Sequence, residues 1–307
     1  MLIVFFYDIL WEKWGILMKI ANDWKDYEII DASCGEKYER WGNYYLLRPD
    51  PQVVWDNGNL LEKYHEKIDA VYHRSNKGGG EWENLKSLPG SWKIHYRDLT
   101  FHIKQMGFKH TGLFPEQAVN WDFMMNKIKN SNREIRVLNL FAYTGGATVA
   151  CLAAGAHVTH VDSSRGMVDW CKENVQSSGY QGDHIRYIVD DVVKFVQREI
   201  RRGNHYDAII MDPPSYGRGA NGEVWDIEKS LSYLVTICCE LLSDQPLFFL
   251  INSYTTGMSS TVLENLLKMT VGKHYSGEIT CGEVGLPIRE NNLVLPCGIY
   301  GRWESHE

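Results

Sequence analysis

Residues 137 to 164, "VLNLFAYTGGATVACLAAGAHVTHVDSS", decide the fold class of this 307-residue chain. The apolar run through Leu140 predicts a buried strand, and Gly145 and Gly146 predict a tight turn. The small residues that follow predict a helix that can pack closely on a sheet. A second apolar run ends at Asp162, an acidic residue at the end of a second strand. A strand, a glycine turn, a helix and a strand in this order are typical of a doubly wound α/β sheet.

The same alternation continues to the end of the sequence. It predicts further helices after each strand until the last two strands, which follow one another directly and therefore indicate an antiparallel edge hairpin. The fold class predicted is α/β and Rossmann-like, with a seven-stranded, mostly parallel sheet. The expected strands lie within residues 133–143, 157–164, 184–191, 206–214, 246–255, 279–288 and 293–303, and the expected helices within 145–156, 165–179, 192–204, 225–244 and 259–270.

The first third of the chain has a different sequence pattern. Residues 26–110 hold short alternating runs rich in Tyr and Trp and broken by Gly, Pro and Asn, which predict a small antiparallel β-rich domain. We therefore expect three segments: an extension over residues 1–17, a β-rich domain over 18–110 and the α/β domain over 111–307. The apolar run at the start is too short to span a bilayer, so no membrane association is expected.

Composition narrows the class of protein. A hydrophobic content of 44% and a charged content of 23% are ordinary for a globular protein. The net charge of -7 argues against a protein that coats nucleic acid by charge alone, although an enzyme can visit RNA through a local patch. The seven cysteines show no CxxC pair, which indicates reduced thiols in a cytoplasmic protein and no metal site.

Polar residues gather where the predicted strands end, which is where ligands bind in such sheets. "AYTGGA" lacks the GxGxxG spacing that cradles a pyrophosphate, so nicotinamide and flavin cofactors are disfavoured. S-adenosylmethionine has no phosphate and needs acids for its ribose and adenine. Asp162 is placed for the ribose hydroxyls, and Asp190 and Asp191 for the adenine amino group, although an Asp at a strand end can instead cap the next helix.

Asp212-Pro213-Pro214 follows the fourth strand of the α/β part. The two prolines stiffen the backbone and remove two N–H donors, so carbonyl groups are left to face an acceptor amino group or ring N–H. Asp212 adds a carboxylate that can orient the acceptor or take its proton, and Tyr216 could stack on an extruded base.

From about Tyr27 to Trp303 the chain resembles the class I S-adenosylmethionine-dependent methyltransferases of the 23S rRNA large-subunit type, a group that includes cytosine-C5 enzymes. The resemblance rests on "TGLFPEQ", "LNLFAYTGG", "HVDSS", "CKENVQSSG", "DDVVKFVQRE" and "DPPSYGRGANGEVWDI". It implies a Rossmann-like core after a small β domain, with residues 111–117 folded over the cofactor. It also implies that Glu116 and Gln117 lie near the methionine end, and that Asp191 binds the adenine. The candidate cofactor-binding residues are Phe114, Glu116, Gln117, Asn139, Phe141, Tyr143, Thr144, Gly145, Asp162, Ser163, Asp190, Asp191 and Asp212; the candidate catalytic residues are Asp212, Pro213 and Tyr216.

The chain departs from the pattern after the fifth strand of the α/β part, where cytosine-C5 enzymes have a nucleophilic cysteine and this sequence has Ser253 and Tyr254. C5 of cytosine becomes nucleophilic only after a thiolate adds to the ring, and Cys281 and Cys297 are expected to be core thiols. We therefore expect methylation of an RNA base, favouring a nitrogen over cytosine C5, with rRNA as the partner and no metal. A small-molecule or protein methyltransferase and a non-catalytic, cofactor-binding scaffold are the alternatives, and the choice between monomer and homodimer stays open.

Overall fold

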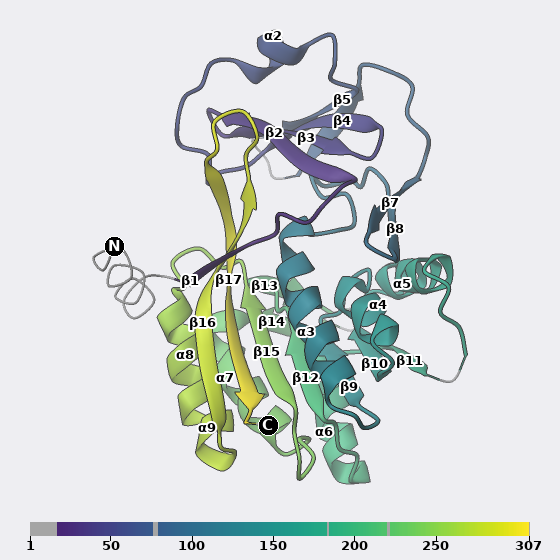
Figure 1. Ribbon diagram of the computed structural model, residues 1–307, viewed down its shortest axis with the longest axis vertical. Helices are drawn as coiled ribbons and strands as arrows, with labels where there is room; N and C mark the ends of the chain where they lie inside the picture. Colours follow the sequence, from purple (N-terminus) through teal and green to yellow (C-terminus); the bar gives the residue numbers. More distant parts are fainter. Residues whose placement is uncertain (1–16, 76–78, 183, 220–221, 307) are drawn as a thin grey trace, which may run out of the picture.

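The computed structural model describes residues 17–75, 79–182, 184–219 and 222–306, and its larger part is built on one eight-stranded sheet (Figure 1). The strand order is β1-β16-β17-β15-β12-β9-β10-β11. The strands are β1 (Leu17–Ile20), β9 (Arg136–Leu140), β10 (His157–Asp162), β11 (Ile185–Val189), β12 (Ala208–Met211), β15 (Phe248–Ser253), β16 (Gly277–Pro287) and β17 (Val294–Ser305).

All seven predicted strands are present, and the predicted α/β class is confirmed. Only β17 runs against its neighbours β15 and β16; the other pairs are parallel. The eighth strand, β1, pairs with β16 and covers the edge that the predicted hairpin would have left open. Of the predicted extension, Leu17 opens β1, and residues 1–16 lie outside the described residues.

Helices cover both faces of this sheet because its strands are apolar on both sides. Val137 and Leu138 of β9, like Phe248 and Phe249 of β15, belong to two different buried clusters, as the period of two along a strand requires. On one face lie α3 (Ala118–Asn130), α4 (Gly146–Ala153) and α5 (Arg165–Ser177); on the other lie α6 (Val192–Arg202), α7 (Ile227–Cys239) and α8 (Ser260–Met269), which continues into α9 (Val271–His274).

Helix α3 was not predicted from the sequence. Asn120, Asn126 and Asn130 weaken its helical signal, since asparagine favours caps and turns over helix interiors. Burial of Trp121, Met124 and neighbouring apolar residues against the sheet compensates for this local weakness. The helix is preceded by the short helix η1 (Pro115–Gln117), which positions the "TGLFPEQ" segment.

A smaller, five-stranded sheet stands beyond the large one (Figure 1). It comprises β2 (Tyr27–Ser33), β3 (Glu36–Trp41), β4 (Tyr44–Pro49), β5 (Ala70–Arg74) and β6 (Gly80–Asn84), with α2 (Leu60–Tyr64) between β4 and β5. The sequence predicted an antiparallel sheet, and for one strand pair this is wrong. β4 and β5 are parallel because α2 lies in the crossover that connects them. Two further hairpins are β7 (Trp92–Tyr96) with β8 (Leu99–Ile103), and β13 (Tyr216–Arg218) with β14 (Val224–Asp226).

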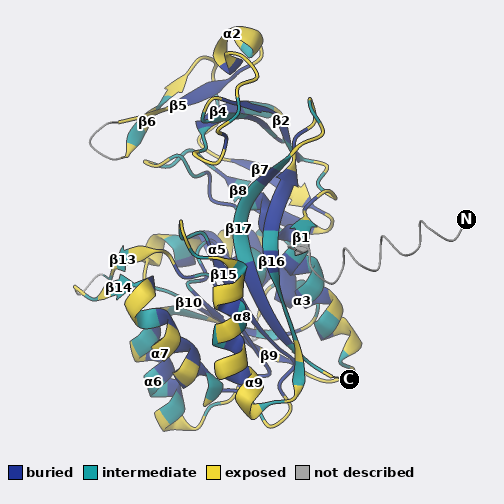
Figure 2. Ribbon diagram, turned by 90° about the vertical axis from the view of Figure 1, so that its left-hand side faces the viewer, coloured by how far each residue is buried: buried dark blue, intermediate teal, exposed yellow. Residues whose placement is uncertain are grey.

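The hairpin of β16 and β17 reaches from the large sheet to the small one (Figures 1 and 2). At its tip the backbone N–H of Arg289 donates to the Ile29 carbonyl at 3.0 Å, and that of Glu290 donates to the Ile30 carbonyl at 3.0 Å. The tip therefore covers part of β2, an edge strand of the small sheet. Among the described residues, no helix combines the length and apolar character that crossing a membrane requires.

Candidate active site

A cleft of about 540 Å³ lies at the carboxyl ends of the central strands, and the small sheet forms its other wall. From the large sheet it is lined by residues that follow β9, β10, β12 and β15, and from the small sheet by residues of β3 and β4. A smaller chamber of about 50 Å³ shares five lining residues with it, namely Leu113, Phe114, Phe141, Tyr143 and Asp212. Together the cleft and the chamber form one candidate site.

Most of the predicted site residues meet at this place. In the cleft they are Phe114, Glu116, Phe141, Tyr143, Asp162, Ser163, Asp212 and Pro213, and in the chamber they include Gln117, Asn139 and Thr144. Segments far apart in the sequence thus converge because parallel strands end at the same edge of the sheet.

The glycine turn after β9 has a backbone that few residues adopt. Phe141 and Tyr143 have φ of 52° and 51°, and Gly145 has φ of 84°. A Cβ at Gly145 would lie 2.2 Å from the Cys171 sulfur, so only glycine fits there. The Asp162 carboxylate holds this turn by accepting the Tyr143 N–H at 2.9 Å and holds the start of α5 by accepting the Ser164 N–H at 2.8 Å.

Asp212 sits in the cleft at the end of β12. Burial, with the nearby Glu116 carboxyl adding to it, raises the pKa of Asp212 to about 7. The turn behind it is fixed, because Trp225 Nε1 donates to the Pro214 carbonyl at 2.7 Å and the hydroxyls of Ser215 and Thr255 lie 2.8 Å apart. Asp212 is therefore a carboxyl group, held on a rigid turn, that can exchange a proton near neutral pH.

An aromatic and amide network closes the inner end of the cleft. The Phe114 ring lies 5.6 Å from the Tyr143 ring and 5.4 Å from the Tyr254 ring. Gln117 Nε2 donates to the Tyr254 hydroxyl at 2.6 Å, and Asn120 joins Gln117 to Asn252 through two bonds of 2.8 Å. Tyr254 was not among the predicted site residues, although its position after β15 was a usable signal.

Cys297 also lines the cleft, whereas the sequence indicated a core thiol. A bulge explains the difference: Val284 pairs with Gly298 and Gly285 with Pro296, so Cys297 is the extra residue of β17. Burial raises the pKa of the Cys297 thiol well above its ordinary value. The thiol is therefore protonated at neutral pH, which is the opposite of what a base-attacking thiolate needs.

Four predicted residues line neither the cleft nor the chamber, namely Gly145 of the turn described above, Asp190, Asp191 and Tyr216. Asp190 forms an ion pair with Arg198, and Asp191 caps α6 by accepting the Lys194 N–H at 2.9 Å. Tyr216 projects from the β13–β14 hairpin with 56% of its surface exposed. Their roles toward adenine and an acceptor base stay predictions.

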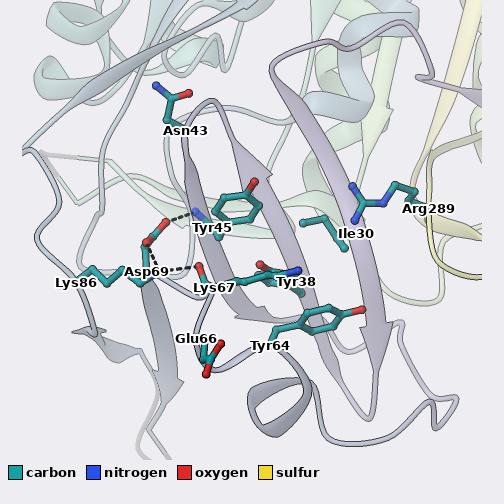
Figure 3. Close-up of a pocket in the computed structure, with 10 residues that line it drawn as sticks. All are labelled: Ile30, Tyr38, Asn43, Tyr45, Tyr64, Glu66, Lys67, Asp69, Lys86 and Arg289. Carbon is teal, nitrogen blue, oxygen red and sulfur yellow. Dashed lines mark hydrogen bonds and ion pairs between the residues drawn. The ribbon is translucent and has the colours of Figure 1, made fainter.

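A second cavity, of about 500 Å³, lies on the other face of the small sheet (Figure 3). Tyr38, Tyr45 and Tyr64 line it together with charged residues. Two of these charges pair with each other, since Asp69 lies 3.1 Å from Lys86, and Asp69 also accepts the Tyr45 N–H at 2.7 Å. It shares no lining residue with the cleft among the described residues, so it is not part of the candidate active site.

The cleft fits S-adenosylmethionine. Each Asp162 oxygen accepts one backbone N–H, which orients the carboxylate while each oxygen retains acceptor capacity for a ribose hydroxyl. Phe141 and Tyr143, which have left-handed backbones, line both the cleft and the chamber. Within the part of the chain that the structure describes, no three His, Cys, Asp or Glu side chains gather as metal ligands.

Comparison with known proteins agrees with this geometry. Residues 43–276 match the family described as S-adenosylmethionine-dependent methyltransferase. A crystal structure of the S-adenosylmethionine-dependent methyltransferase from Agrobacterium tumefaciens is 33% identical, superimposes with a TM-score of 0.89, and aligns over 95% of this chain and 94% of that one.

Curated relatives carry more specific names. Ribosomal RNA large subunit methyltransferase K/L of Pseudoalteromonas atlantica is 30% identical over 66% of this chain, and ribosomal RNA large subunit methyltransferase K of Neisseria meningitidis serogroup B is 25% identical over 73% of it. The matched region spans 31% of the first relative and 63% of the second.

Proposed function

Because the chain belongs to the family of S-adenosylmethionine-dependent methyltransferases, we propose that it transfers a methyl group to an RNA base, with a ribosomal RNA as the substrate. The observation that carries the proposal is the convergence of Asp162, Asp212 and Pro213 on one cleft at the strand ends. The names of the curated relatives support RNA as the acceptor. A ribosomal substrate also favours a cytoplasmic location.

The proposed chemistry needs little from the protein beyond alignment and the removal of one proton. S-adenosylmethionine supplies a methyl group activated by its sulfonium. Asp162, Ser163 and the turn at Tyr143, which line the cleft, would hold the cofactor, and Gln117 and Asn139, which line the chamber, would face its methionine end. Asp212 and the Pro213 carbonyl orient the acceptor, and Asp212 takes up its proton because its pKa of about 7 suits that exchange.

We propose a nitrogen acceptor over cytosine C5. Ser253 and Tyr254 follow β15, where a nucleophilic cysteine would stand, and the pKa of the one cleft thiol that the described residues include, Cys297, is raised. The division into an extension, a β-rich domain and a methyltransferase domain at residues 17/18 and 110/111 stays a prediction.

Mass spectrometry of rRNA nucleosides from cells with and without the gene tests the proposal. One methylated nucleoside should disappear without the gene and return with the wild-type protein but not with Asp212→Ala. Purified Asp212→Ala should bind S-adenosylhomocysteine within a few-fold of wild type while methyl transfer falls about 100-fold. If rRNA modification is unchanged and the protein methylates a small molecule or a protein instead, the RNA assignment is wrong; binding of the cofactor with no transfer to any acceptor would indicate a scaffold.

A further inference from the structure

Three cations gather on the wall of the cleft that the small sheet supplies. Lys37 of β3 and Arg48 of β4 are direct cross-strand partners, so their side chains share one face of the sheet. Tyr38, the next residue along β3, points to the other face and lines the cavity of Figure 3. Arg48 Nη1 donates to the Lys109 carbonyl at 2.8 Å and so brings Lys109 to the same wall.

The platform beneath these cations is rigid. Glu39 is fully buried and accepts from Arg48 Nε at 2.6 Å and from Arg48 Nη2 at 2.8 Å. It also accepts from the Tyr27 hydroxyl at 2.6 Å. A buried, bidentate pair with all its partners in place fixes the direction of the guanidinium and, through it, the Lys109 backbone.

Of these three cations, Lys109 is the one that forms no ion pair among the described residues. Arg48 pairs with Glu39, and Lys37 lies 3.1 Å from Asp50 and 3.6 Å from Glu39. The Lys109 ammonium is half-buried and bonds the Pro49 carbonyl at 3.3 Å, and no carboxylate of the described residues lies within ion-pair distance of it. The three cations also act on the neighbouring His110, since burial and these positive charges lower the pKa of His110 to about 4. Asp50 acts on this ammonium only from beyond ion-pair distance. A half-buried ammonium without a direct ion pair is costly, and a bound anion would offset that cost.

The position of Lys109 indicates which anion would pair with it. The residues proposed for the cofactor follow β9 and β10 or face the chamber, all on the large sheet or on the segment that covers it. Lys37 and Arg48 stand on the small sheet and Lys109 is bonded to Arg48, whereas Asp212, Pro213 and Pro214 follow β12 of the large sheet. All of them line the same cleft. A bound anion there would flank the acceptor, and the most abundant oxyanion of a nucleic acid is its backbone phosphate.

We propose that Lys37, Arg48 and Lys109 form a phosphate subsite that binds the backbone of the acceptor strand beside the base to be methylated. The inference rests on the proposed function and deepens it. It makes the acceptor a nucleotide within a polynucleotide, because every nucleotide of such a strand brings a phosphate to Lys109, whereas a neutral small molecule or an uncharged protein side chain brings no anion. It also reconciles an acidic protein with an RNA substrate, since a local cluster suffices where the net charge does not.

Lys109→Met is the informative substitution, because Arg48→Met would remove the bidentate partner of the buried Glu39 carboxylate and destabilise the fold. Binding of a 23S rRNA transcript is measured from 50 to 300 mM KCl for wild type, Lys109→Met and the matched control Lys104→Met, a lysine whose ammonium lies over the Trp170 ring instead. We expect Lys109→Met to weaken RNA binding about 10-fold at low salt and to reduce the slope of log K against log [KCl] by about one. Lys104→Met should change neither, and Lys109→Arg should restore both.

Binding of S-adenosylhomocysteine separates the two possible anions. If Lys109→Met weakens this binding tenfold and leaves the salt slope for RNA intact, the cluster binds the cofactor carboxylate and the proposal is overturned. If the wild-type protein binds no rRNA, the proposed function fails, and the subsite is then tested alone: the ¹³C resonance of the reductively methylated Lys109 amine should shift with inorganic pyrophosphate. An unmoved resonance would refute the subsite as well.

Discussion

Asp212→Asn should stabilise the folded protein, and the gain should grow with pH. The pKa of this carboxyl is raised from 3.8 to about 7 in the fold. The folded state therefore holds a proton that the unfolded state releases, and the contribution of Asp212 to stability is lost as pH rises from about 4 to about 7. Asparagine mimics the protonated form and carries no such dependence.

The size of the effect follows from the shift. With a pKa of 3.8 in the unfolded state and about 7 in the folded state, the wild-type protein at pH 5 is about 1.5 kcal/mol less stable than a protein with a neutral side chain at position 212. Above pH 8 this difference reaches about 4 kcal/mol. The advantage of Asp212→Asn should therefore increase by about 2–3 kcal/mol between pH 5 and pH 8.5.

Urea denaturation at the two pH values measures this increase, and Asp244→Asn, on an exposed loop, gives the baseline for an Asp-to-Asn change. Addition of S-adenosylmethionine, whose sulfonium is positive, should lower the pKa of Asp212 more than addition of its neutral demethylated product. An advantage of Asp212→Asn that is the same at both pH values would show that Asp212 is ionised as it is in water, and the proton-acceptor role would lose its physical basis.

Other predictions concern the cofactor turn, the cleft thiol and the pH profile. Asp162→Ala should weaken S-adenosylhomocysteine binding by about 1.5–3 kcal/mol in calorimetry, whereas Asp169→Ala on the exposed face of α5 should not; equal effects would contradict the ribose role. Gly145→Ala should lower the free energy of unfolding by about 1–3 kcal/mol, because its Cβ would meet Cys171 at 2.2 Å and its φ is 84°; an unchanged urea midpoint would mean that the turn relaxes. Cys297→Ala should keep methyl transfer within a few-fold of wild type. Two results together would instead support the C5 mechanism: a variant that folds and binds cofactor but is inactive, and covalent trapping of the wild-type protein on RNA containing 5-fluorocytosine. For wild type, kcat/KM should rise with pH through about 7 as Asp212 loses its proton, and a flat profile would argue against it.

Periodicity predicted the large sheet because its strands are apolar on both faces and its helices are amphipathic. The same reasoning placed Asp162 and Asp212 at one edge, since the end of each parallel strand can be read from where its apolar run stops. Periodicity could not show whether Asp191 caps a helix or binds a ligand, because both roles place an acid between a strand and a helix.

Features that depend on tertiary contacts could not be predicted from the sequence. The bulge that brings Cys297 into the cleft depends on the pairing register of β16 and β17, which no local pattern records. Lys109 lies on the same wall as Lys37 through tertiary contacts, among them the bond from Arg48 to its carbonyl across 61 residues of chain. Helix α3 was missed for a related reason, as its stability derives from burial against the sheet and not from propensity.

The reach of the β16–β17 hairpin to β2 has a consequence for how the chain acquires its structure. Glu28 and Arg289, which are joined by an ion pair of 3.0 Å, lie 261 residues apart in sequence. During synthesis the small sheet emerges early, but this edge of it stays uncovered until the hairpin has left the ribosome. Contacts of such long range form slowly. A nascent chain therefore carries an open strand edge for most of its translation, and this is the interval in which a chaperone would protect it from pairing with another chain.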